Sequence, residues 1–579
     1  MPRPERRPLV QRPRGSAEAR LRTSAGSMLA RIYASRGIES TDDLDLSMEH
    51  LLDPSGLTGM AAAVNLLHAA LERDARILFV GDFDADGATS VALGMTALRA
   101  MGSSRVDYVV PNRFEFGYGL TPEIVAFAQS RDPDVLVTVD NGVSSVEGVA
   151  CAKALGWQVL ITDHHLPGAE LPAADAIVNP NLADCGFASK SLAGVGVIFY
   201  VMVALRTRLR ELGWFAEKGL TEPNLAELLD LVALGTVADV VPLDRNNRIL
   251  VRAGLRRIRN GLVRPGIAAL CGVARRKPER LTSADLGYAL GPRLNAAGRL
   301  EDMSLGIDCL LASDIDSAFE RAERLNELNR ARRDIESDMT EEALAIVERI
   351  DPDEGMPVGL CLFDEGFHQG IVGILASRLR ERFHRPVIVC APAGADEVGR
   401  AELRGSGRSV PGFHLRDALE AIATRNPGLL QRFGGHAMAA GLTISRWQFH
   451  RFADAFDSEV RRHLSESSLT GMLETDGELK DDELTLDNAR RIELGGPWGQ
   501  TFPEPLFQGE FDVVVTRPVG ERHTRLVLSL GDRMVDAIAF NTRLDADVER
   551  ILAAYRLGID DHGDVETLQL VIEYLERVS

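Results

Sequence analysis

The chain has 579 residues, a hydrophobic fraction of 45% and a formal net charge of −20 at pH 7. This length and apolar content are enough for several domains, each with its own core. The negative charge argues against a surface that coats polyanions in general, but it leaves room for a local basic channel and for bound cations. No apolar stretch is long enough to cross a bilayer, so we expect no membrane contact.

The termini and the cysteines suggest where the chain works. Residues 1–25 are rich in Arg and Pro and lack hydrophobic periodicity, so we expect a disordered tail rather than a signal peptide. The six cysteines are scattered without paired spacing. This pattern predicts reduced thiols in a cytoplasmic protein, with no zinc ribbon and no disulfide framework.

The next region, residues 26–310, alternates apolar strands with helical segments. Ile77–Val80, for example, is followed by a helical segment at Ala88–Met101. Such βαβ alternation is typical of an α/β fold with a parallel sheet that helices cover on both faces. Residues 311–350 contain neither Pro nor Gly and place apolar residues at helical spacing. We therefore expect one long connecting helix there.

The last two regions predict a second lobe and a barrel. In residues 351–465, Val358–Phe363 and Pro386–Val389 are expected strands of a second α/β lobe, with Gly-rich turns at Arg404–Ser409 and Gly434–Gly441. Residues 466–579 hold short alternating strands. Their spacing suits a small β-barrel, for which an oligonucleotide-binding (OB) fold is one candidate.

Three expected strands of the first region end in acids or imidazoles. Ile77–Val80 leads into Gly81-Asp82-Phe83-Asp84-Ala85-Asp86-Gly87, Val135–Val139 into Asp140-Asn141-Gly142, and Val159–Thr162 into Asp163-His164-His165. The carboxyl ends of parallel strands meet at one edge of a sheet. Because unpaired buried charge is costly, these acids indicate a metal site at that edge.

The donor set favours hard divalent cations. Carboxylate oxygens suit Mg²⁺ or Mn²⁺, and imidazole shifts the preference toward Mn²⁺. Any one acid alone is most often a surface or capping residue, but three strand-end clusters with two adjacent histidines favour a catalytic site. A pair of ions about 3.5–4 Å apart can hydrolyse a phosphoester. The candidate ligands are Asp82, Asp84, Asp86, Asp140, His164 and Asp239. Of these, Asp239 lies just after an apolar helical segment.

These motifs resemble the DHH phosphoesterase superfamily, named for Asp163-His164-His165, and within it the RecJ exonuclease family. The resemblance runs from about residue 40 to the C-terminus. The stretches more particular to that family are Ser191–Gly196, Gly291–Arg299, His368–Gly373, Arg404–Ser409, Gly434–His436 and Gly496–Gly499. It implies a DHH catalytic domain, a DHHA1-type substrate-binding lobe and a C-terminal OB barrel.

The resemblance also implies an activity: digestion of single-stranded DNA from its 5′ end to 5′-mononucleotides, with two Mn²⁺ or Mg²⁺ ions, in DNA recombination and repair. In that mechanism Asp140 bridges the ions, Asp239 holds one or both, and His164 is a ligand. His165 contacts phosphate or donates a proton to the leaving oxygen, and Asp163 orients the adjacent imidazole. Single-strand-binding protein and a repair helicase are the implied partners.

The DNA contacts follow from the same resemblance. Ser406 and Arg408 would hold the 5′ phosphate, helped by Ser409 in the same Gly-rich stretch, since Arg pairs with phosphate in a bidentate way. Further candidates are Arg113, Arg293, Arg299 and His436. Phe114, Phe116 and Tyr118 could stack on bases, although core packing explains two of them equally well. A cleft between two lobes would be too narrow for a duplex, and the barrel would bind the trailing strand.

Three other functions stay open from the sequence. One is an oligonucleotide or cyclic-dinucleotide phosphodiesterase, or an inorganic pyrophosphatase, of the same superfamily, although those are usually shorter and lack the barrel. Another is a non-catalytic single-strand DNA-binding scaffold, whose expected mark is loss of ligands, whereas all of them are present here. The third is an exonuclease that also acts on RNA.

Overall fold

The computed structural model describes residues 7–111, 119–350, 356–395, 399–465, 469, 471–520, 523–531, 533–545, 547–561 and 565–578. These residues form two compact units. One holds residues 11–328 and 474–579, and the other holds 329–473 with the first residues of the chain.

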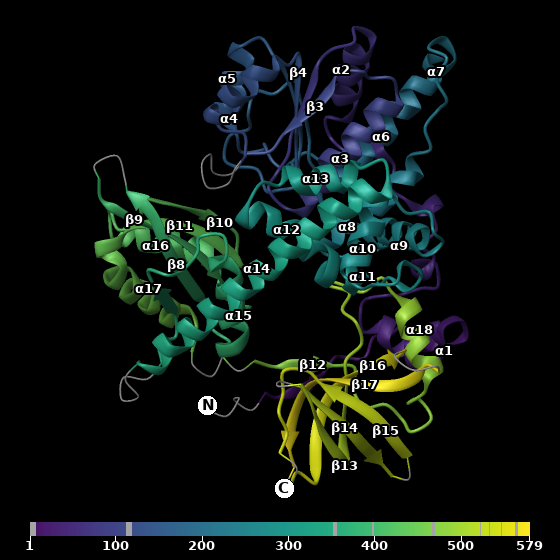
Figure 1. Cartoon of the computed structure of the whole chain (residues 1–579), viewed down its shortest axis with the longest axis vertical. Coiled ribbons are helices and arrows are strands. Elements are labelled where there is room, and N and C mark those ends of the chain that lie inside the picture. The colour runs from purple at the N-terminus through teal and green to yellow at the C-terminus, as the bar shows by residue number, and fades with distance from the viewer. Residues whose placement is uncertain are drawn as a thin grey trace. The chain divides into compact units, whose positions relative to one another are not determined.

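The first unit is built on a parallel sheet with strand order β3-β2-β4-β5-β6. Figure 1 labels β3 and β4 of this sheet, together with α4 and α5. Its strands are β2 (Ile77–Val80), β3 (Val106–Val109), β4 (Val135–Val139), β5 (Gln158–Thr162) and β6 (Ala176–Val178). The helices around it are α2 (Met60–Glu72), α3 (Ala85–Ala100), α4 (Pro122–Ala128), α5 (Val146–Ala154), α6 (Gly194–Glu211) and α7 (Trp214–Glu217). The predicted βαβ organisation is confirmed.

Both faces of this sheet are buried, which explains its uninterrupted apolar strands. Phe79 and Val137 point into the larger core, with residues of α2, α3 and α6. Their neighbours Leu78 and Leu136 point to the other face, where they pack with residues of α4 and α5. Successive strand residues alternate between the faces, so both sets must be apolar. In β2, β4 and β5 the charged residues therefore follow the strands, whereas the edge strand β3 holds a half-exposed Asp107.

A group of mainly helical segments follows the sheet in the same unit. It comprises α8 (Leu229–Ala238), α9 (Arg245–Arg259), α10 (Pro265–Val273), α11 (Ser283–Asp285), a π-helical turn (Leu286–Leu290), α12 (Gly291–Leu300) and α13 (Ser304–Leu311). Helix α8 is almost wholly buried, with Leu231, Val232 and Ala233 at 0% exposure. It therefore forms a fixed support for Asp239, which caps its C-terminal end.

The predicted disordered tail over residues 1–25 is wrong for most of its length. Strand β1 (Leu9–Gln11) pairs with β12 (Leu473–Thr475), and α1 begins at Glu18 and ends at Ala34. Leu21 and Ala25 of α1 are buried in the same core as the sheet. The apolar residues of this segment are too few to show periodicity by themselves, but contacts with distant parts of the chain order them.

The C-terminal region forms a closed five-stranded barrel with strand order β13-β14-β15-β17-β16. Only the β15–β17 pair is parallel, and the arrangement is that of an OB fold. Its elements are α18 (Leu486–Gly495), β13 (Phe507–Val519), β14 (His523–Leu530), β15 (Arg533–Ala539), β16 (Arg550–Asp560) and β17 (Thr567–Arg577). The predicted barrel is thus confirmed.

The second unit has a mixed sheet of order β10-β11-β9-β8-β7. Its elements are β7 (Leu360–Phe363), α15 (Val372–Phe383), β8 (Val387–Ala395), β9 (Ala401–Arg408), α16 (Leu415–Arg425), β10 (Arg432–Gly435), β11 (Ala439–Ser445) and α17 (Phe449–His463). The predicted Gly-rich turn at Arg404–Ser409 is wrong, because residues 404–408 lie in β9, whereas Gly434–Gly441 does contain a turn, at residues 436–438 between β10 and β11. A Cβ at Gly407 would lie 2.7 Å from Leu415 Cδ2, so the glycines of β9 allow close packing rather than a turn.

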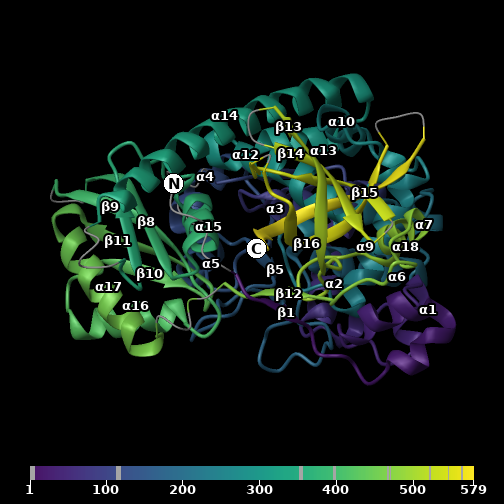
Figure 2. The same cartoon turned by 90° about the horizontal axis from the view of Figure 1, so that it is seen from below.

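The predicted long helix is α14, which begins at Ile315 and ends at Glu348 (Figure 2). The division between the two units falls within it, at residues 328 and 329. Among the residues that the structure describes, no helix is both long and apolar enough to pass through a membrane.

A buried ion pair ties the end of α1 to the segment before the barrel. The Arg36 guanidinium donates to both oxygens of Asp476, at 2.7 and 2.9 Å, and the two side chains are 1% and 2% exposed. Removing one partner of such a pair leaves the other charge buried, which costs about 3–5 kcal/mol. We predict that Arg36→Met lowers the free energy of unfolding by that amount in urea titrations followed by tryptophan fluorescence.

The matched control is Arg22→Met, since Arg22 pairs with Glu18 but is 61% exposed. Exposed pairs contribute about 0–1 kcal/mol, so this variant should unfold almost as the wild type does. Equal, small losses in both variants would contradict the role given to the Arg36–Asp476 pair.

Candidate metal centre

Asp84 shapes the acidic loop that follows β2. Its Oδ1 accepts the backbone N–H groups of Asp86 and Gly87, both at 3.0 Å, and so caps the N-terminus of α3. A Cβ at Gly87 would lie 2.6–2.8 Å from main-chain atoms of Asp82. Only glycine therefore lets the loop close this tightly. The result is three carboxylates held within one short turn at the end of the sheet.

Asp86 is held by the N-terminus of a second helix. Its two oxygens accept the backbone N–H groups of Gly194 and Val195, at 2.6 and 2.9 Å, in the first turn of α6. A helix N-terminus favours a carboxylate in this position. A Cβ on Gly194 would lie 2.6 Å from Cβ of Asp140. The glycine thus brings α6 against two of the predicted ligands at once.

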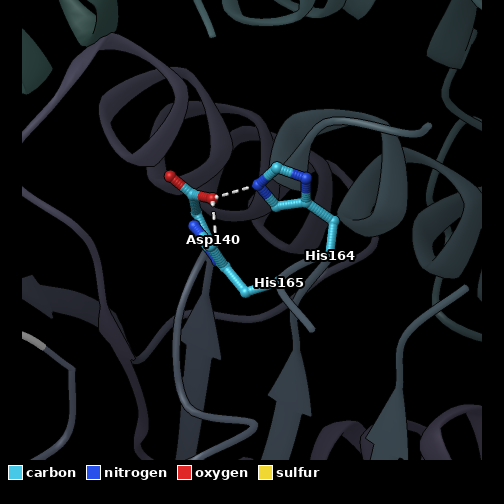
Figure 3. A group of neighbouring side chains, drawn as sticks. All are labelled: Asp140, His164 and His165. Atoms are coloured by element: carbon cyan, nitrogen blue, oxygen red, sulfur yellow. Dashed lines mark ion pairs between the residues drawn. The ribbon is translucent and has the colours of Figure 1, made fainter. Parts of the chain in front are cut away.

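Asp140, His164 and Asp239 meet at the ends of β4, β5 and α8. His164 Nε2 lies 3.0 Å from Asp140 Oδ1 and 3.5 Å from Asp239 Oδ2. Figure 3 shows one Asp140 oxygen facing both His164 and His165, with His165 Nδ1 at 4.0 Å. Asp140 and Val240, next to Asp239, have φ values of +62° and +60°. Such left-handed backbone is strained for these residues and is found preferentially at functional sites.

Asp163 works on its neighbours rather than on the centre. Its Oδ1 accepts the N–H groups of His164 and His165 and lies 2.8 Å from His165 Nδ1, while Oδ2 accepts the N–H of Val143 at 2.9 Å. This contact fixes the ring of His165 with Nδ1 toward Asp163, so Nε2 is the ring nitrogen that does not face Asp163. The orienting role that the resemblance implies for Asp163 is consistent with this contact.

The acids of this centre cannot all be ionised at low cost in a buried place. Burial, with the charge of Asp84, raises the pKa of Asp86 to about 7. Burial and the neighbouring carboxylates raise the pKa of Asp140 and of Asp239 well above the ordinary value. Each shift reflects desolvation plus like charges at short range, which bound cations would relieve.

The pKa shifts of His165 and Asp163 favour the charged form of each group, unlike those of the acids above. Burial lowers the pKa of His165, but the hydrogen bond and charge of Asp163 outweigh it and raise the pKa overall. Burial raises the pKa of Asp163, but the contact with His165 outweighs it and leaves that pKa lowered. The pair thus favours an ionised Asp163 beside a protonated His165.

The donor atoms fit divalent cations. Within each of three groups, the ligand atoms lie within 4.8 Å of one another: Asp82, Asp84 and Asp140; Asp86, His164 and Asp239; Asp140, His164 and His165. In addition, Asp239 Oδ2 is buried and accepts no hydrogen bond from any residue that the structure describes. A set rich in carboxylate oxygen with one or two imidazoles suits Mg²⁺ or Mn²⁺.

The predicted phosphate-binding residues of the second unit lie around the end of β9. Arg408 donates from Nη1 to Ser406 Oγ at 3.0 Å, and Gly373, in the first turn of α15, lies directly against both side chains. His436 is exposed in the turn after β10, three residues before Ala439, which pairs with Arg408. Ser409 does not join this group, because its buried hydroxyl donates to the carbonyl of Phe413.

The remaining predicted arginines divide between two places. Arg293 and Arg299 both lie on α12, where Arg293 donates to Asn326 Oδ1 and to the carbonyl of Ala289. Arg113, like the predicted stacking residues Phe114, Phe116 and Tyr118, falls outside the described residues.

The structure adds Asn295, which the sequence reasoning missed as a functional residue. Asn295 Oδ1 accepts the N–H of Ala85 at 2.7 Å, inside the acidic loop. Next to it on α12, a Cβ at Gly298 would lie 1.8 Å from the carbonyl oxygen of Phe83. Helix α12 therefore holds the loop from outside. The available signal was the position of both residues within the Gly291–Arg299 motif.

Comparison with family models defines the class of protein. The model of the DHH family, N-terminal domain, matches residues 76–236, that of the DHHA1 domain matches 355–462, and that of the RecJ OB domain matches 475–574. The acidic centre falls in the first match or close after it, and the Ser406–Arg408 group falls in the second.

Similar proteins narrow the class further. The chain is 53% identical to the single-stranded-DNA-specific exonuclease RecJ of Dickeya dadantii, over 97% of this chain and 98% of that one. It is 52% identical to the protein of the same name from Escherichia coli, over 94% and 95%. The crystal structure of Thermus thermophilus RecJ in complex with Mn²⁺ superposes with a TM-score of 0.81 at 28% identity, over 100% of this chain and 80% of that one. The chain belongs to the RecJ family.

The raised pKa of Asp86 predicts how the metal-free protein responds to pH. Because the pKa is raised from 3.8 to about 7, the folded state binds more protons than the unfolded state between these values. Stability from this group is thus lost as the pH rises through that window. In EDTA, we predict that the melting temperature of Asp86→Asn minus that of the wild type increases as the pH rises from about 5 to about 7.5.

The control for this experiment is Asp132→Asn, since Asp132 lies on the surface with a side chain 73% exposed. Its melting temperature relative to the wild type should vary little with pH. Added Mn²⁺ should stabilise the wild type at pH 7.5 more than it stabilises Asp86→Asn. A pH-independent difference between Asp86→Asn and the wild type would contradict this account.

Proposed function

We propose that the chain is an exonuclease specific for single-stranded DNA, which hydrolyses phosphodiester bonds from the 5′ end with two divalent cations. The observation that carries this proposal is a pair of neighbouring ligand groups, linked by the 3.0 Å contact between Asp140 Oδ1 and His164 Nε2. Asp82 and Asp84 group with Asp140 on one side, while Asp86, His164 and Asp239 form the second group. The names of its relatives support the DNA substrate, and related structures hold Mn²⁺ or Mg²⁺.

In this proposal Asp82, Asp84, Asp86, Asp140, His164 and Asp239 would hold the cations, and Asp140 would be the ligand common to both. The cations would supply an activated water and neutralise charge on the phosphate. Asp140 is suited to bridging because it belongs to one ligand group and its Oδ1 lies 3.0 Å from His164 of the other. The first turn of α6 fixes Asp86, and α8 presents Asp239. The ligands are thus held by rigid elements before substrate arrives.

His165 is the proposed proton donor to the leaving oxygen. Its Nδ1 faces Asp163, and the net effect of its surroundings is a raised pKa. A protonated imidazole held in one orientation can give a proton from Nε2 to the oxygen that leaves phosphorus. Asp163 stays ionised and stabilises that charge, so it acts as a positioning residue.

The Ser406–Arg408 group is the proposed site for the terminal 5′ phosphate. Arg408 is half-buried beside the first turn of α15, which suits a phosphate because both guanidinium and helix N-terminus favour anions. Recognition of a 5′ terminus gives the direction of digestion, and 5′-mononucleotides are the expected products.

The activity we propose belongs to DNA recombination and repair in the cytoplasm. Family membership supports the role, and all six cysteines are free thiols. Single-strand-binding protein and a repair helicase are the partners that we expect to bring the substrate.

The direct test is release of mononucleotides from single-stranded DNA with a 5′ phosphate, in Mn²⁺ or Mg²⁺, beside blunt duplex and the dinucleotide pApA. We predict that Asp140→Asn loses more than about 100-fold in rate, since even partners behind the ligands of a metal site contribute about 10–100-fold. The surface variant Asp132→Asn serves as control. Equal digestion of duplex and single strands, or activity on pApA alone, would refute the proposal.

A hollow of about 680 Å³, lined in part by Val240, is the proposed path of the trailing strand within the first unit. Its lining includes three exposed apolar or aromatic side chains, those of Val240, Tyr288 and Leu494. It also includes Arg252 and Arg256, which make no ion pair with described residues. Tyr288 is 81% exposed on the π-helical turn, a kind of turn frequent at functional sites. Bases can stack on such a ring while arginines pair with phosphates.

We predict that Tyr288→Ala raises the KM for a 20-nucleotide strand by about 5- to 150-fold, which corresponds to one stacked base. The effect should be much smaller for a trinucleotide, which is too short to extend far from the metal centre. Tyr288→Phe is the matched control, because it keeps the ring and loses only the hydroxyl. A KM increase that is the same for both lengths would show that the ring binds no trailing base.

A further inference from the structure

One side of α15 faces the end of β9. Gly373, Ser377 and Arg380 are spaced at i, i+4 and i+7, which places them on one stripe of the helix. This stripe flanks the buried residues of α15 that pack in the core of the lobe. A Cβ at Gly373 would lie 3.1 Å from Ser406 Oγ and 3.0 Å from Arg408 Nη2. The stripe that carries Arg380 is therefore the one in contact with the Ser406–Arg408 group.

Arg380 is an incompletely satisfied cation on that stripe. Its Nε is buried and finds no hydrogen-bond partner among the described residues, while its Nη2 donates to Glu381 at 3.1 Å. A buried N–H without a partner costs free energy, which a bound acceptor would recover. Side chains of a helix lean toward its N-terminus, so the guanidinium of Arg380 is carried back toward Gly373.

Arg408 lacks a carboxylate partner as well. It donates to Ser406 Oγ and to the carbonyl of Gly407, and it makes no ion pair with any described residue. Burial lowers the pKa of Arg408, and the charge of Arg380 lowers it further, which shows that the two cations interact. Two guanidiniums of like charge at one place, one of them without a counter-ion, form a receptor for an anion.

We infer that Arg380 is a second guanidinium of the terminal-phosphate site and that, with Arg408, it makes this site specific for a phosphate monoester. The inference rests on the proposed function and names a specificity residue for it. A 5′-terminal monoester carries a charge of about −1.5 to −2 at pH 7, whereas each internal diester carries one negative charge. Two cations favour the first over the second. The pair therefore distinguishes a strand end from the middle of a strand.

The kinetic test compares 5′-phosphate with 5′-hydroxyl strands of equal sequence. For Arg380→Ala, we expect the ratio of KM for the hydroxyl end to KM for the phosphate end to fall about tenfold or more, the effect of losing one charged hydrogen bond. Arg380→Lys keeps the charge but loses the planar, forked set of N–H donors of the guanidinium. Its KM ratio should therefore lie between those of Arg380→Ala and the wild type.

Arg382→Ala is the matched control. Arg382 is nine residues after Gly373, half a turn away around α15, and its guanidinium lies over the ring of Phe383. Its KM ratio should equal that of the wild type. If Arg380→Ala and Arg382→Ala give the same ratio as the wild type, Arg380 takes no part in phosphate recognition.

Binding without turnover separates this inference from the proposed function. In EDTA, calorimetry would compare thymidine 5′-monophosphate with its methyl ester, which carries a single negative charge. We expect the wild type to prefer the monoester and Arg380→Ala to lose about tenfold of that preference. A preference that depends on Arg380 supports the inference even if no DNA is digested. An exonuclease with an Arg380-independent preference would overturn it.

Discussion

Crowding of carboxylates at one buried edge of a parallel sheet is the constraint on which the account depends. Asp82, Asp86 and Asp140 are all buried, and desolvation with like charges raises the pKa of Asp86 and Asp140. A fold does not gather ionisable groups in this way for stability, since each raised pKa marks free energy lost at neutral pH. Bound divalent cations would remove the conflict, and the same crowding would then serve to hold them.

Close backbone contacts keep this centre in shape. Gly194 lets the first turn of α6 reach Asp86 and Asp140, and Gly298 lets α12 rest on the acidic loop. The candidate ligands thus lie on buried helices and at strand ends, so little freedom would be lost on binding metal or substrate. Asp163 extends the same principle to His165, whose orientation and charge it sets. Chemistry and rigidity therefore have one structural origin.

The sequence predicted what local patterns control. Ile77–Val80 and Val135–Val139 match their strands to the residue, because uninterrupted apolar runs that end in acids admit few other structures. Prediction from the sequence failed where contacts between residues far apart in the chain determine the structure. Leu21 of the expected tail is buried against remote helices, and Gly407 lies in a strand because β9 pairs with both β8 and β11. The contact of Asn295 with Ala85 spans 210 residues, so the Gly291–Arg299 motif could single out Asn295 but could not identify its partner.

The candidate ligands show the same division. Asp140 and His164 were found from strand ends, and the structure brings them to 3.0 Å, but which acid is shared between two ions depends on three-dimensional spacing. The most direct test of the central claim is a Mn²⁺ titration followed by calorimetry and electron paramagnetic resonance. The account predicts two ions per chain with a spin-coupled signal, which Asp140→Asn abolishes. A single ion, or a coupled pair that survives Asp140→Asn, would contradict it.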